Sequence, residues 1–432
     1  MHNQQLKPVY IIDGARTPFL KARGIRGPFS ASDLATRAGQ ALLNKHNVDP
    51  TTLDEVIMGC MIPSEDEANI GRIIALRLGC GYRVPGWTVQ RNCASGLQSL
   101  DSAYQNIATG RSNLVLAGGT ETMSRAPLLY QPEMVNWLAR FGKAKSFTAK
   151  CSLLKELRPK YLKPIISLLH GLNDFLCDCN MGQSTEEIAY LYNISRHDMD
   201  EFAMQSQLRA TEAQSQGLFD DEMISIFDIK GELYNHDDGV RPDTSMESLA
   251  KLKPVFDRKF GAITPANSSQ VSDGSAVLLM ASEEAVEQYQ LPVLGRFVDI
   301  HWAGCNPYLM GLGPSYAVPP LLDRHELSVN DIDYWEINEA FAAQTLGCLK
   351  AWQSEAFCQK ELGLTSTFGS IDSQRLNIDG GAIALGHPVG ASGARIALHV
   401  LNVLKRNDQK RGVATLCIGG GIGGAALLER VN

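Results

Sequence analysis

The sequence predicts an α/β fold built from two similar halves, in which sheets are covered by helices on both faces. Two observations carry this prediction. Short apolar and β-branched runs alternate with segments of helical periodicity, and the same rhythm occurs in the amino-terminal and in the carboxy-terminal part of the 432 residues. Strands that alternate with helices are typical of sheets packed between helical layers. The two halves indicate an internal duplication, although their residues differ.

In the amino-terminal half, three apolar runs predict strands, at residues 9–13, 55–59 and 113–118. Ser30 or Ser32 can cap a helix that begins soon afterwards, because a hydroxyl there accepts a hydrogen bond from a free backbone N–H. The apolar face of that helix would be formed by Leu34, Ala38, Ala41 and Leu42.

The carboxy-terminal half repeats the pattern. Strands are expected at residues 293–299, 332–337 and 413–418, and residues 425–428 complete a hairpin-like return. A helix follows Asn338, with Ala342, Leu346 and Leu349 on one side.

Composition narrows the class of function. Apolar residues make up 44% and charged residues 20%, as in globular proteins, and the net charge of −7 argues against a general nucleic-acid-binding role. No run reaches the roughly 18 apolar residues of a membrane span, and the first residues resemble neither a signal nor a transit peptide. The ten cysteines are scattered, which fits reduced thiols, and Cys177-x-Cys179 is too closely spaced for a redox Cys-x-x-Cys pair. We therefore expect a cytoplasmic protein.

Residues 135–170 differ in charge from the rest of the chain. They carry eight Lys or Arg side chains against the single acid Glu156, interleaved with leucines and isoleucines. Such a basic, amphipathic insertion suits a solvated helical hairpin, a surface for an anionic membrane or a partner, or a cover over a long acyl chain. The sequence leaves these interpretations open.

Cys93 is the first candidate catalytic residue. Apolar residues follow it at helical spacing, at Leu97, Leu100, Tyr104 and Ile107. A helix should therefore begin directly after Cys93, and we expect its free N–H groups and dipole to favour the thiolate. The small residues Ala94, Ser95 and Gly96 leave room for a thioester to approach.

His387 and Cys417 are the second and third candidates. His387 lies between Gly386 and Pro388, which predicts an irregular loop that exposes the ring, so that it could deprotonate a thiol. Cys417 ends a predicted strand and precedes a glycine cluster whose backbone N–H groups could stabilise an oxyanion. A phosphate-binding turn is the alternative there, but the Lys-Ser/Thr ending of a P-loop is missing.

Four segments, in chain order, resemble the signature blocks of the thiolase family. They are Asn92-Cys93-Ala94-Ser95-Gly96, Asn338-Glu339-Ala340-Phe341, Gly386-His387-Pro388 and Cys417-Ile418-Gly419-Gly420. Residues 14–19, 118–124, 181–186, 241–244 and 266–274 also match, so the resemblance spans residues 9–428. It implies two βαβαβαββ-type halves packed as a five-layer α-β-α-β-α sandwich with an inserted loop domain. The expected division is residues 1–122 and 266–290 for the amino-terminal half, 123–265 for the insertion and 291–432 for the carboxy-terminal half.

The resemblance also implies roles for single residues. Cys93 would attack the 3-oxoacyl thioester and carry the acyl group, activated by His387, while Asn338 would hold a water beside His387. Cys417 would protonate the departing acetyl-CoA enolate, and the N–H groups of Cys93 and Gly419 would form an oxyanion hole. The residues expected to bind CoA are Met181, Phe256, Ser269, Ala340 and Phe341 along the pantetheine channel, with Arg241 near the nucleotide.

Three departures from the family pattern bear on specificity. Asn180 stands where many biosynthetic thiolases carry histidine, and residues 265–267 replace the commoner Ala-Gly-Asn. The insertion resembles that of fatty-acid oxidation complex β subunits, yet those often have His-Glu-Ala-Phe where this chain has Asn338-Glu339-Ala340-Phe341.

The resulting prediction is a reversible, CoA-dependent acyltransferase that cleaves 3-oxoacyl-CoA through an acyl-cysteine intermediate, and we expect it to act in fatty-acid β-oxidation. The alternatives are a biosynthetic acetoacetyl-CoA thiolase and, in a different class, a non-catalytic acyl-CoA-binding protein. We expect CoA as substrate, no permanently bound cofactor, no metal, and a homodimer or homotetramer. A hydratase/dehydrogenase partner or a membrane surface could engage residues 135–170.

Overall fold

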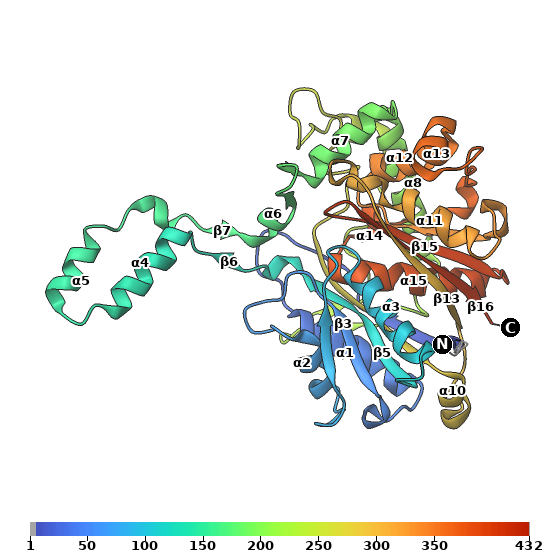
Figure 1. Cartoon of the computed structure of the whole chain (residues 1–432), viewed down its shortest axis with the longest axis horizontal. Helices are drawn as coiled ribbons and strands as arrows, with labels where there is room; N and C mark the ends of the chain where they lie inside the picture. The colour runs from blue at the N-terminus through green and yellow to red at the C-terminus, as the bar shows by residue number, and fades with distance from the viewer. Residues whose placement is uncertain (1–5, 432) are drawn as a thin grey trace.

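The fold is organised around one sheet of ten strands that runs through the whole molecule (Figure 1). The computed structural model describes residues 6–431, so residues 1–5 and 432, at the outer ends of the predicted domains, lie outside the described residues. The strands are ordered β14-β15-β16-β13-β1-β12-β5-β3-β4, with β2 paired to β12. Their bounds are β1 (Val9–Arg16), β2 (Leu20–Lys21), β3 (Glu55–Gly59), β4 (Gly86–Val89), β5 (Leu114–Thr122), β12 (Ser272–Ala281), β13 (Gly295–Gly304), β14 (Tyr334–Ile337), β15 (Arg411–Ile418) and β16 (Ile422–Arg430).

The helices of the two halves are α1 (Ala31–Lys45), α2 (Ile70–Arg77), α3 (Ser95–Ala108), α10 (Glu283–Tyr289), α11 (Gly313–Asp323), α12 (Ala342–Gln353), α13 (Glu355–Leu362), α14 (Ala382–Leu385) and α15 (Val389–Arg406). The segment between β5 and β12 contributes α4 (Pro132–Lys143), α5 (Phe147–Leu154), α6 (Ser167–Gly171), α7 (Met181–Leu191), α8 (Arg196–Ser215) and α9 (Met246–Ala250). It also contains six two-residue strands, β6 (Leu128–Leu129), β7 (Ile165–Ile166), β8 (Asn173–Asp174), β9 (Cys179–Asn180), β10 (Ile226–Phe227) and β11 (Leu233–Tyr234).

The predicted five layers are present, and they arise from alternation along the strands. In β3, Ile57 packs against α3 and α15 in the middle of the molecule, whereas Val56 and Met58 pack against α1 and α2 outside. In β15, Leu416 faces the same middle layer, whereas Val413 faces α11. Because successive side chains point to opposite faces, each half of the sheet is apolar on both sides. The two half-sheets meet where β1 pairs antiparallel with β13.

The strand pairings confirm the internal duplication. In both halves two parallel neighbours are followed by antiparallel ones: β3 and β5 lead to β12 and β1, as β14 and β15 lead to β16 and β13. The position of β4 beside β3 is taken in the second half by a parallel bridge between Trp335 and Leu376. In the middle layer, α3 is thus matched by α15. The boundaries proposed above for the domains stay predictions.

The predicted strands are found: β3 has the expected bounds, β14 is two residues shorter than expected, and β1, β5, β13, β15 and β16 are longer. Ser30 is the cap of α1, where its hydroxyl accepts the N–H of Asp33 and the Asp33 side chain accepts the N–H of Ser30. The expected face of α12 is only partly right. Leu346 and Leu349 are half-buried, whereas small residues such as Ala343 are fully buried, because α12 packs closely against α7 and α11.

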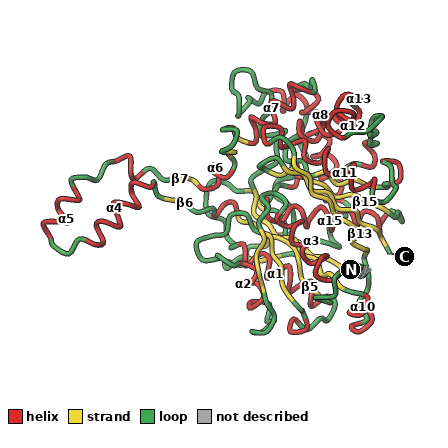
Figure 2. The backbone as a smooth tube through the Cα atoms, in the orientation of Figure 1, coloured by secondary structure: helices red, strands yellow, loops and turns green. Residues whose placement is uncertain are grey.

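The basic insertion forms a helical hairpin that projects from the body of the molecule (Figures 1 and 2). β6 and β7 pair antiparallel and form its neck, and α4 and α5 lie beyond them. No helix within residues 6–431 is long and apolar enough to cross a membrane.

Candidate active site

The turn that carries Cys93 connects β4 to α3 and is held by its own polar side chains. Asn92 has a left-handed backbone with a φ of 46°, which reverses the chain just before Cys93. The N–H of Arg91 donates to Ser95 Oγ over 2.9 Å, and Ser95 Oγ donates to the Asn92 carbonyl over 2.7 Å. Since α3 begins at Ser95, the predicted position of Cys93 at the amino-terminal end of a helix is confirmed.

The pKa of Cys93 contradicts the expectation that the helix end would favour a thiolate. Burial raises the pKa of this thiol to about 11, and the backbone N–H groups of Gly419 and of Cys93 itself offset only part of the increase. The free-energy cost of desolvating a charged sulfur is larger than the stabilisation that a few N–H groups and the partial charge at the helix end provide. Cys93 is therefore a thiol at neutral pH, and it needs a base before it can attack a carbonyl.

His387 lies in the loop between α14 and α15, as predicted, but its ring is buried and only 7% exposed. Gly386 has a φ of 106°, and a side chain there would collide with Ser272. Gly386 thus does not expose the loop, as we expected, but lets the loop fold inward against β12. The N–H of His387 donates to the Gln270 carbonyl over 3.1 Å, which fixes its backbone beside the catalytic pocket.

Ser392 determines which nitrogen of His387 carries the proton. Ser392 Oγ donates its single hydrogen to the Pro388 carbonyl over 3.0 Å. The contact of 2.6 Å between Ser392 Oγ and His387 Nδ1 is then a bond that Nδ1–H donates. Nε2 is left as an acceptor, with Asn338 Nδ2 at 3.5 Å. The neutral ring thus presents its basic nitrogen to the pocket.

Burial, and secondarily the positive charge of Arg395, lowers the pKa of His387 to about 4. The ring is therefore neutral at physiological pH and able to accept a proton. Asn338 Oδ1 is buried and forms no hydrogen bond with another described residue. A buried carbonyl oxygen of this kind is suited to hold a water or a polar group of a ligand, as expected from the sequence.

Cys417 is the penultimate residue of β15 and is almost completely buried. Burial, followed by the neighbouring Cys93, raises the pKa of Cys417 well above its ordinary value, so it carries a proton at rest. Asn92 Nδ2 donates to the Gly419 carbonyl over 2.7 Å and ties the two thiol-bearing turns together. The N–H of Gly419 lies close enough to Cys93 to lower the pKa of its thiol, so the same N–H could stabilise an oxyanion formed on an acyl group at this residue.

One cavity of about 140 Å³ collects most of the predicted site. Its lining includes Cys93, His387, Cys417, Gly419, Met181, Phe256, Ser269, Ala340 and Phe341. Phe256 and Phe341 meet edge to face at 5.8 Å between ring centroids and form an apolar wall. Arg241 is not among the lining residues. It is exposed, and its backbone N–H donates to Gln207 Oε1. Its placement at the nucleotide end stays a prediction.

A second cavity, of about 390 Å³, also reaches Cys93. It shares Leu172, Met181, Val389 and Gly419 with the first cavity, and it adds Met61, Gln90, Asn92, Gly171, Asn173, Asp174, Phe175, Leu176 and Gly420. The chain between α6 and β9 supplies much of this lining. Asp174 is its only carboxylate, and its lining contains no Lys, Arg or His from the described part of the chain.

Sequence reasoning missed two residues that support the site. Ser392 lies in the first turn of α15, one helical turn beyond His387, and that spacing was the available signal. Glu121 is buried, and its carboxylate accepts the N–H groups of Met61, Ile62 and Gly390 over 2.9 to 3.1 Å. Burial raises the pKa of Glu121 to about 7, although these N–H groups oppose the shift. Glu121 thereby joins the start of α15 to the loop that lines the second cavity.

Asn180 does not line either cavity. Its side chain caps α7 and accepts the N–H of Gln183 over 2.9 Å. In this chain the position that differs from many biosynthetic enzymes thus stabilises a helix. The sulfur atoms of Cys177 and Cys179 lie 3.1 Å apart as free thiols, and their interpretation as structural residues stays a prediction.

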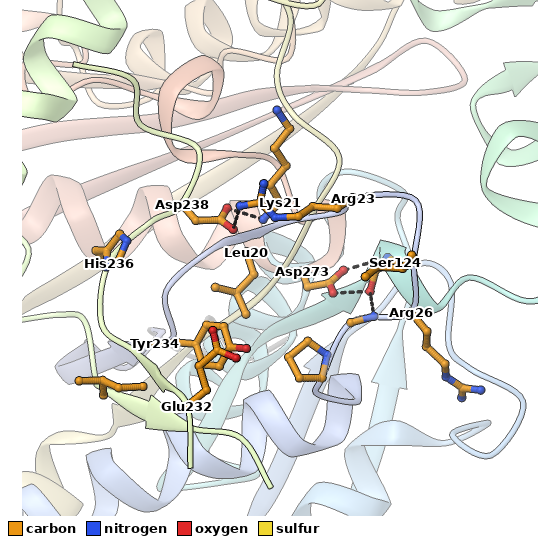
Figure 3. A pocket seen from close by; sticks show the side chains of 14 residues that line it. Leu20, Lys21, Arg23, Arg26, Ser124, Glu232, Tyr234, His236, Asp238 and Asp273 are labelled. Atoms are coloured by element: carbon orange, nitrogen blue, oxygen red, sulfur yellow. Dashed lines mark hydrogen bonds and ion pairs between the residues drawn. The ribbon is translucent and has the colours of Figure 1, made fainter. Parts of the chain in front are cut away.

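A separate hollow of about 360 Å³ lies between the strand β2 region and the loop after β11 (Figure 3). Its charged side chains are largely satisfied within the chain. Arg23 pairs with Asp238 at 2.9 Å, and Ser124 donates to Asp273. None of the predicted catalytic residues lines it.

Comparison with known proteins agrees with this geometry. The amino-terminal domain of the thiolase family matches residues 9–284, and the carboxy-terminal domain matches residues 291–430. This chain belongs to the thiolase family. As a thiolase it falls in the class of acyltransferases that act on acyl-CoA.

Three similar proteins differ in their substrates. The thiolase is 39% identical to the beta-ketoadipyl-CoA thiolase of Pseudomonas aeruginosa, over 98% of this chain and 100% of that protein. The structure of human mitochondrial 3-ketoacyl-CoA thiolase in complex with CoA has a TM-score of 0.84 at 34% identity and covers 98% of both chains. The Bacillus anthracis acetyl-CoA acetyltransferase has a TM-score of 0.85 at 34% identity, covering 99% of this chain and 100% of that one.

Proposed function

We propose that this thiolase is a degradative 3-oxoacyl-CoA thiolase, which cleaves its substrate with CoA to acetyl-CoA and a shortened acyl-CoA. The observation that carries the proposal is the second cavity at Cys93. An acyl group on Cys93 needs space beyond its carbonyl carbon, and apolar side chains such as Met61, Leu172 and Phe175 line that space. An enzyme for acetyl groups alone would have no use for it.

In the first half-reaction, Nε2 of His387 accepts the proton of the Cys93 thiol as the sulfur attacks the C3 carbonyl carbon. The N–H groups of Cys93 and Gly419 stabilise the oxyanion that forms there. The bond between C2 and C3 then breaks, and its electron pair passes to the enolate of acetyl-CoA. Cys417 donates its proton to C2, while His387 and the water held by Asn338 hold the thioester oxygen.

In the second half-reaction, CoA enters the pantetheine channel formed by Met181, Phe256, Ser269, Ala340 and Phe341. Its thiol loses a proton to the Cys417 thiolate and attacks the acyl group on Cys93. The shortened acyl-CoA leaves, and Cys93 recovers its proton from His387. Every proton is thus returned, and the residues need no metal or permanently bound cofactor for these steps.

Rates of thiolysis across a chain-length series test the proposal. We expect kcat/KM to be retained or to rise from acetoacetyl-CoA to 3-oxooctanoyl-CoA. A steep loss beyond acetoacetyl-CoA would instead favour a biosynthetic acetoacetyl-CoA thiolase, the candidate to which the likeness with the Bacillus anthracis acetyltransferase points.

A covalent adduct separates both enzymes from a non-catalytic acyl-CoA-binding protein. Incubation with acetyl-CoA should add one acetyl group to Cys93, detected by mass spectrometry of the digested protein, and the Cys93→Ala variant should show none. Binding of CoA without any adduct would contradict the catalytic role.

The proposal includes a homodimer or homotetramer in the cytoplasm. Light scattering coupled to gel filtration measures the oligomeric state, and fractionation of cells measures the location of the protein. Co-purification of a hydratase/dehydrogenase would extend the proposal to an oxidation complex.

A further inference from the structure

The basic arm, residues 130–164, stands apart from the catalytic body (Figures 1 and 2). Its neck consists of two pairs, Leu128 with Ile166 and Leu129 with Ile165. No arm residue lines either cavity at Cys93 among the residues described there. The arm therefore does not line the space beside Cys93, and these cavities give no support to one of the three interpretations of this sequence, a cover over a long acyl chain.

The arm has a small core of its own. Trp137 in α4 stacks on Phe141 with 4.9 Å between ring centroids, and Trp137 Nε1 donates to the Leu153 carbonyl in α5 over 2.8 Å. Arg140 and Glu156 form an ion pair of 2.7 Å that closes the hairpin. These contacts hold the two helices together without help from the body, so the arm is an ordered element.

Several large apolar side chains of the arm remain outside this core. The most exposed is Phe147 at 82%, and Val135, Leu154 and Leu162 are each more than half exposed. Phe147 starts α5 at the far turn of the hairpin, between Lys145 and Lys150. Exposed apolar groups gathered on one projecting element mark a surface for interaction.

The charge of the arm is opposite to that of the rest of the chain. Its eight cations, all exposed, are Arg140, Lys143, Lys145, Lys150, Lys155, Arg158, Lys160 and Lys163. Against the two acids Glu133 and Glu156 they give a net charge of +6, which leaves −13 for the remainder because the whole chain carries −7. Apart from Arg140, none of them forms an ion pair with a residue of the described range 6–431.

We propose that the basic arm docks on the surface of a bilayer that contains anionic phospholipid. Segments that bind at a membrane interface are typically composed of cations that flank exposed aromatic and aliphatic side chains. Their apolar groups enter the headgroup boundary, and their cations contact lipid phosphates. An acidic protein surface would satisfy the cations but would leave Phe147 and Leu154 without apolar partners. The arm lies on the membrane and does not span it, since α4 and α5 have 12 and 8 residues.

Co-sedimentation of the full-length protein with vesicles tests this proposal. We expect binding to vesicles of phosphatidylcholine mixed with phosphatidylglycerol, weaker binding as salt is added, and little binding to phosphatidylcholine alone. Phe147→Ser should weaken the binding about tenfold through the loss of apolar insertion. Lys145→Gln and Lys150→Gln should each weaken it about fivefold.

Matched controls lie elsewhere on the surface. Ile229 is 96% exposed, and Ile229→Ser and Lys230→Gln remove an apolar group and a charge from the loop between β10 and β11 without touching the arm. Thiolysis of acetoacetyl-CoA should be unchanged in all of these variants, because none of the residues contacts the catalytic pocket.

Two results would overturn the proposal. One is no binding to the anionic vesicles at low salt by a wild-type protein that is active in solution. The other is vesicle binding that is unchanged in the arm variants but weakened in the control variants. If Phe147→Ser and the lysine variants instead alter the oligomeric state or release a bound protein, and vesicle binding is absent, the arm is a protein interface and the membrane assignment is wrong.

Discussion

Replacing Ser392 with alanine should slow the acylation of Cys93 although Ser392 does not line the catalytic cavity. The hydroxyl receives the Nδ1–H of His387 over 2.6 Å, and both side chains are buried. Without it, Nδ1–H has no partner, and the imidazole can move its proton to Nε2. A ring protonated at Nε2 can no longer accept the proton of the Cys93 thiol.

The size of the effect follows from that single bond. A buried donor that loses its partner costs about 1–3 kcal/mol. Because this cost falls on the tautomer that acts as the base, the barrier to acylation rises by the same amount. The rate of acylation should therefore fall about 5- to 150-fold. Binding of CoA should change little, because Phe256 and Ser269 are untouched.

Stopped-flow measurement of CoA release from acetyl-CoA reports the acylation step directly. Ser99→Ala is the matched control: its hydroxyl contacts the carbonyls of Gly96 and Gly118 at 2.6 Å in α3, so it removes a buried hydroxyl without touching His387. An unchanged acylation rate in a folded Ser392→Ala protein, or an equal loss in Ser99→Ala, would refute the reasoning.

Four further predictions concern the same region. Cys417→Ser should retain acetylation by acetyl-CoA but slow thiolysis of acetoacetyl-CoA about 10²- to 10⁴-fold, because the acid at C2 is lost. Equal loss of both half-reactions would contradict the separate roles proposed for Cys93 and Cys417. Because the pKa of His387 is lowered to about 4, acylation should stay constant down to about pH 5, and a midpoint near the ordinary histidine value would contradict a buried base. The same shift makes unfolding easier as pH falls from the ordinary histidine value toward 4, since the unfolded state then binds the proton more tightly, and urea titration at each pH measures this. Finally, Asp174 should make 3-oxoadipyl-CoA a substrate about tenfold poorer than 3-oxohexanoyl-CoA through repulsion of the terminal carboxylate. Asp174→Asn should reduce that ratio, and a preference of the wild type for 3-oxoadipyl-CoA would show that another group neutralises the charge.

Much of the fold could be predicted from local pattern. The strand at residues 55–59 is found at the same bounds, and the helix after Cys93 follows from apolar residues at helical spacing, because one face of each helix must be buried. The four active-site segments were also visible, since catalysis requires particular residues beside glycines that leave space for a thioester.

The state of the catalytic groups could not be predicted in this way. Sequence suggested a thiolate at Cys93 and an exposed ring at His387, and both expectations were wrong. A pKa depends on how much water the surrounding chain excludes, and that chain comes from β12, α15 and the turn at Gly419, far from Cys93 in sequence. Local spacing contains no information on this desolvation.

The sequence by itself determined that strands and helices alternate in two similar halves, and it singled out Cys93, His387 and Cys417 as the candidates for acyl and proton transfer. Only the tertiary structure decided which nitrogen of His387 faces the pocket as an acceptor, that Arg241 lies outside the cavity at Cys93, that a second cavity meets Cys93, and that the basic arm lines neither of them. The physical reason is the separation in sequence over which each effect acts. Periodicity and capping act over one or two turns of chain, whereas burial, hydrogen-bond partners and cavities are set by segments hundreds of residues apart that meet only when the two halves of the sheet enclose α3 and α15.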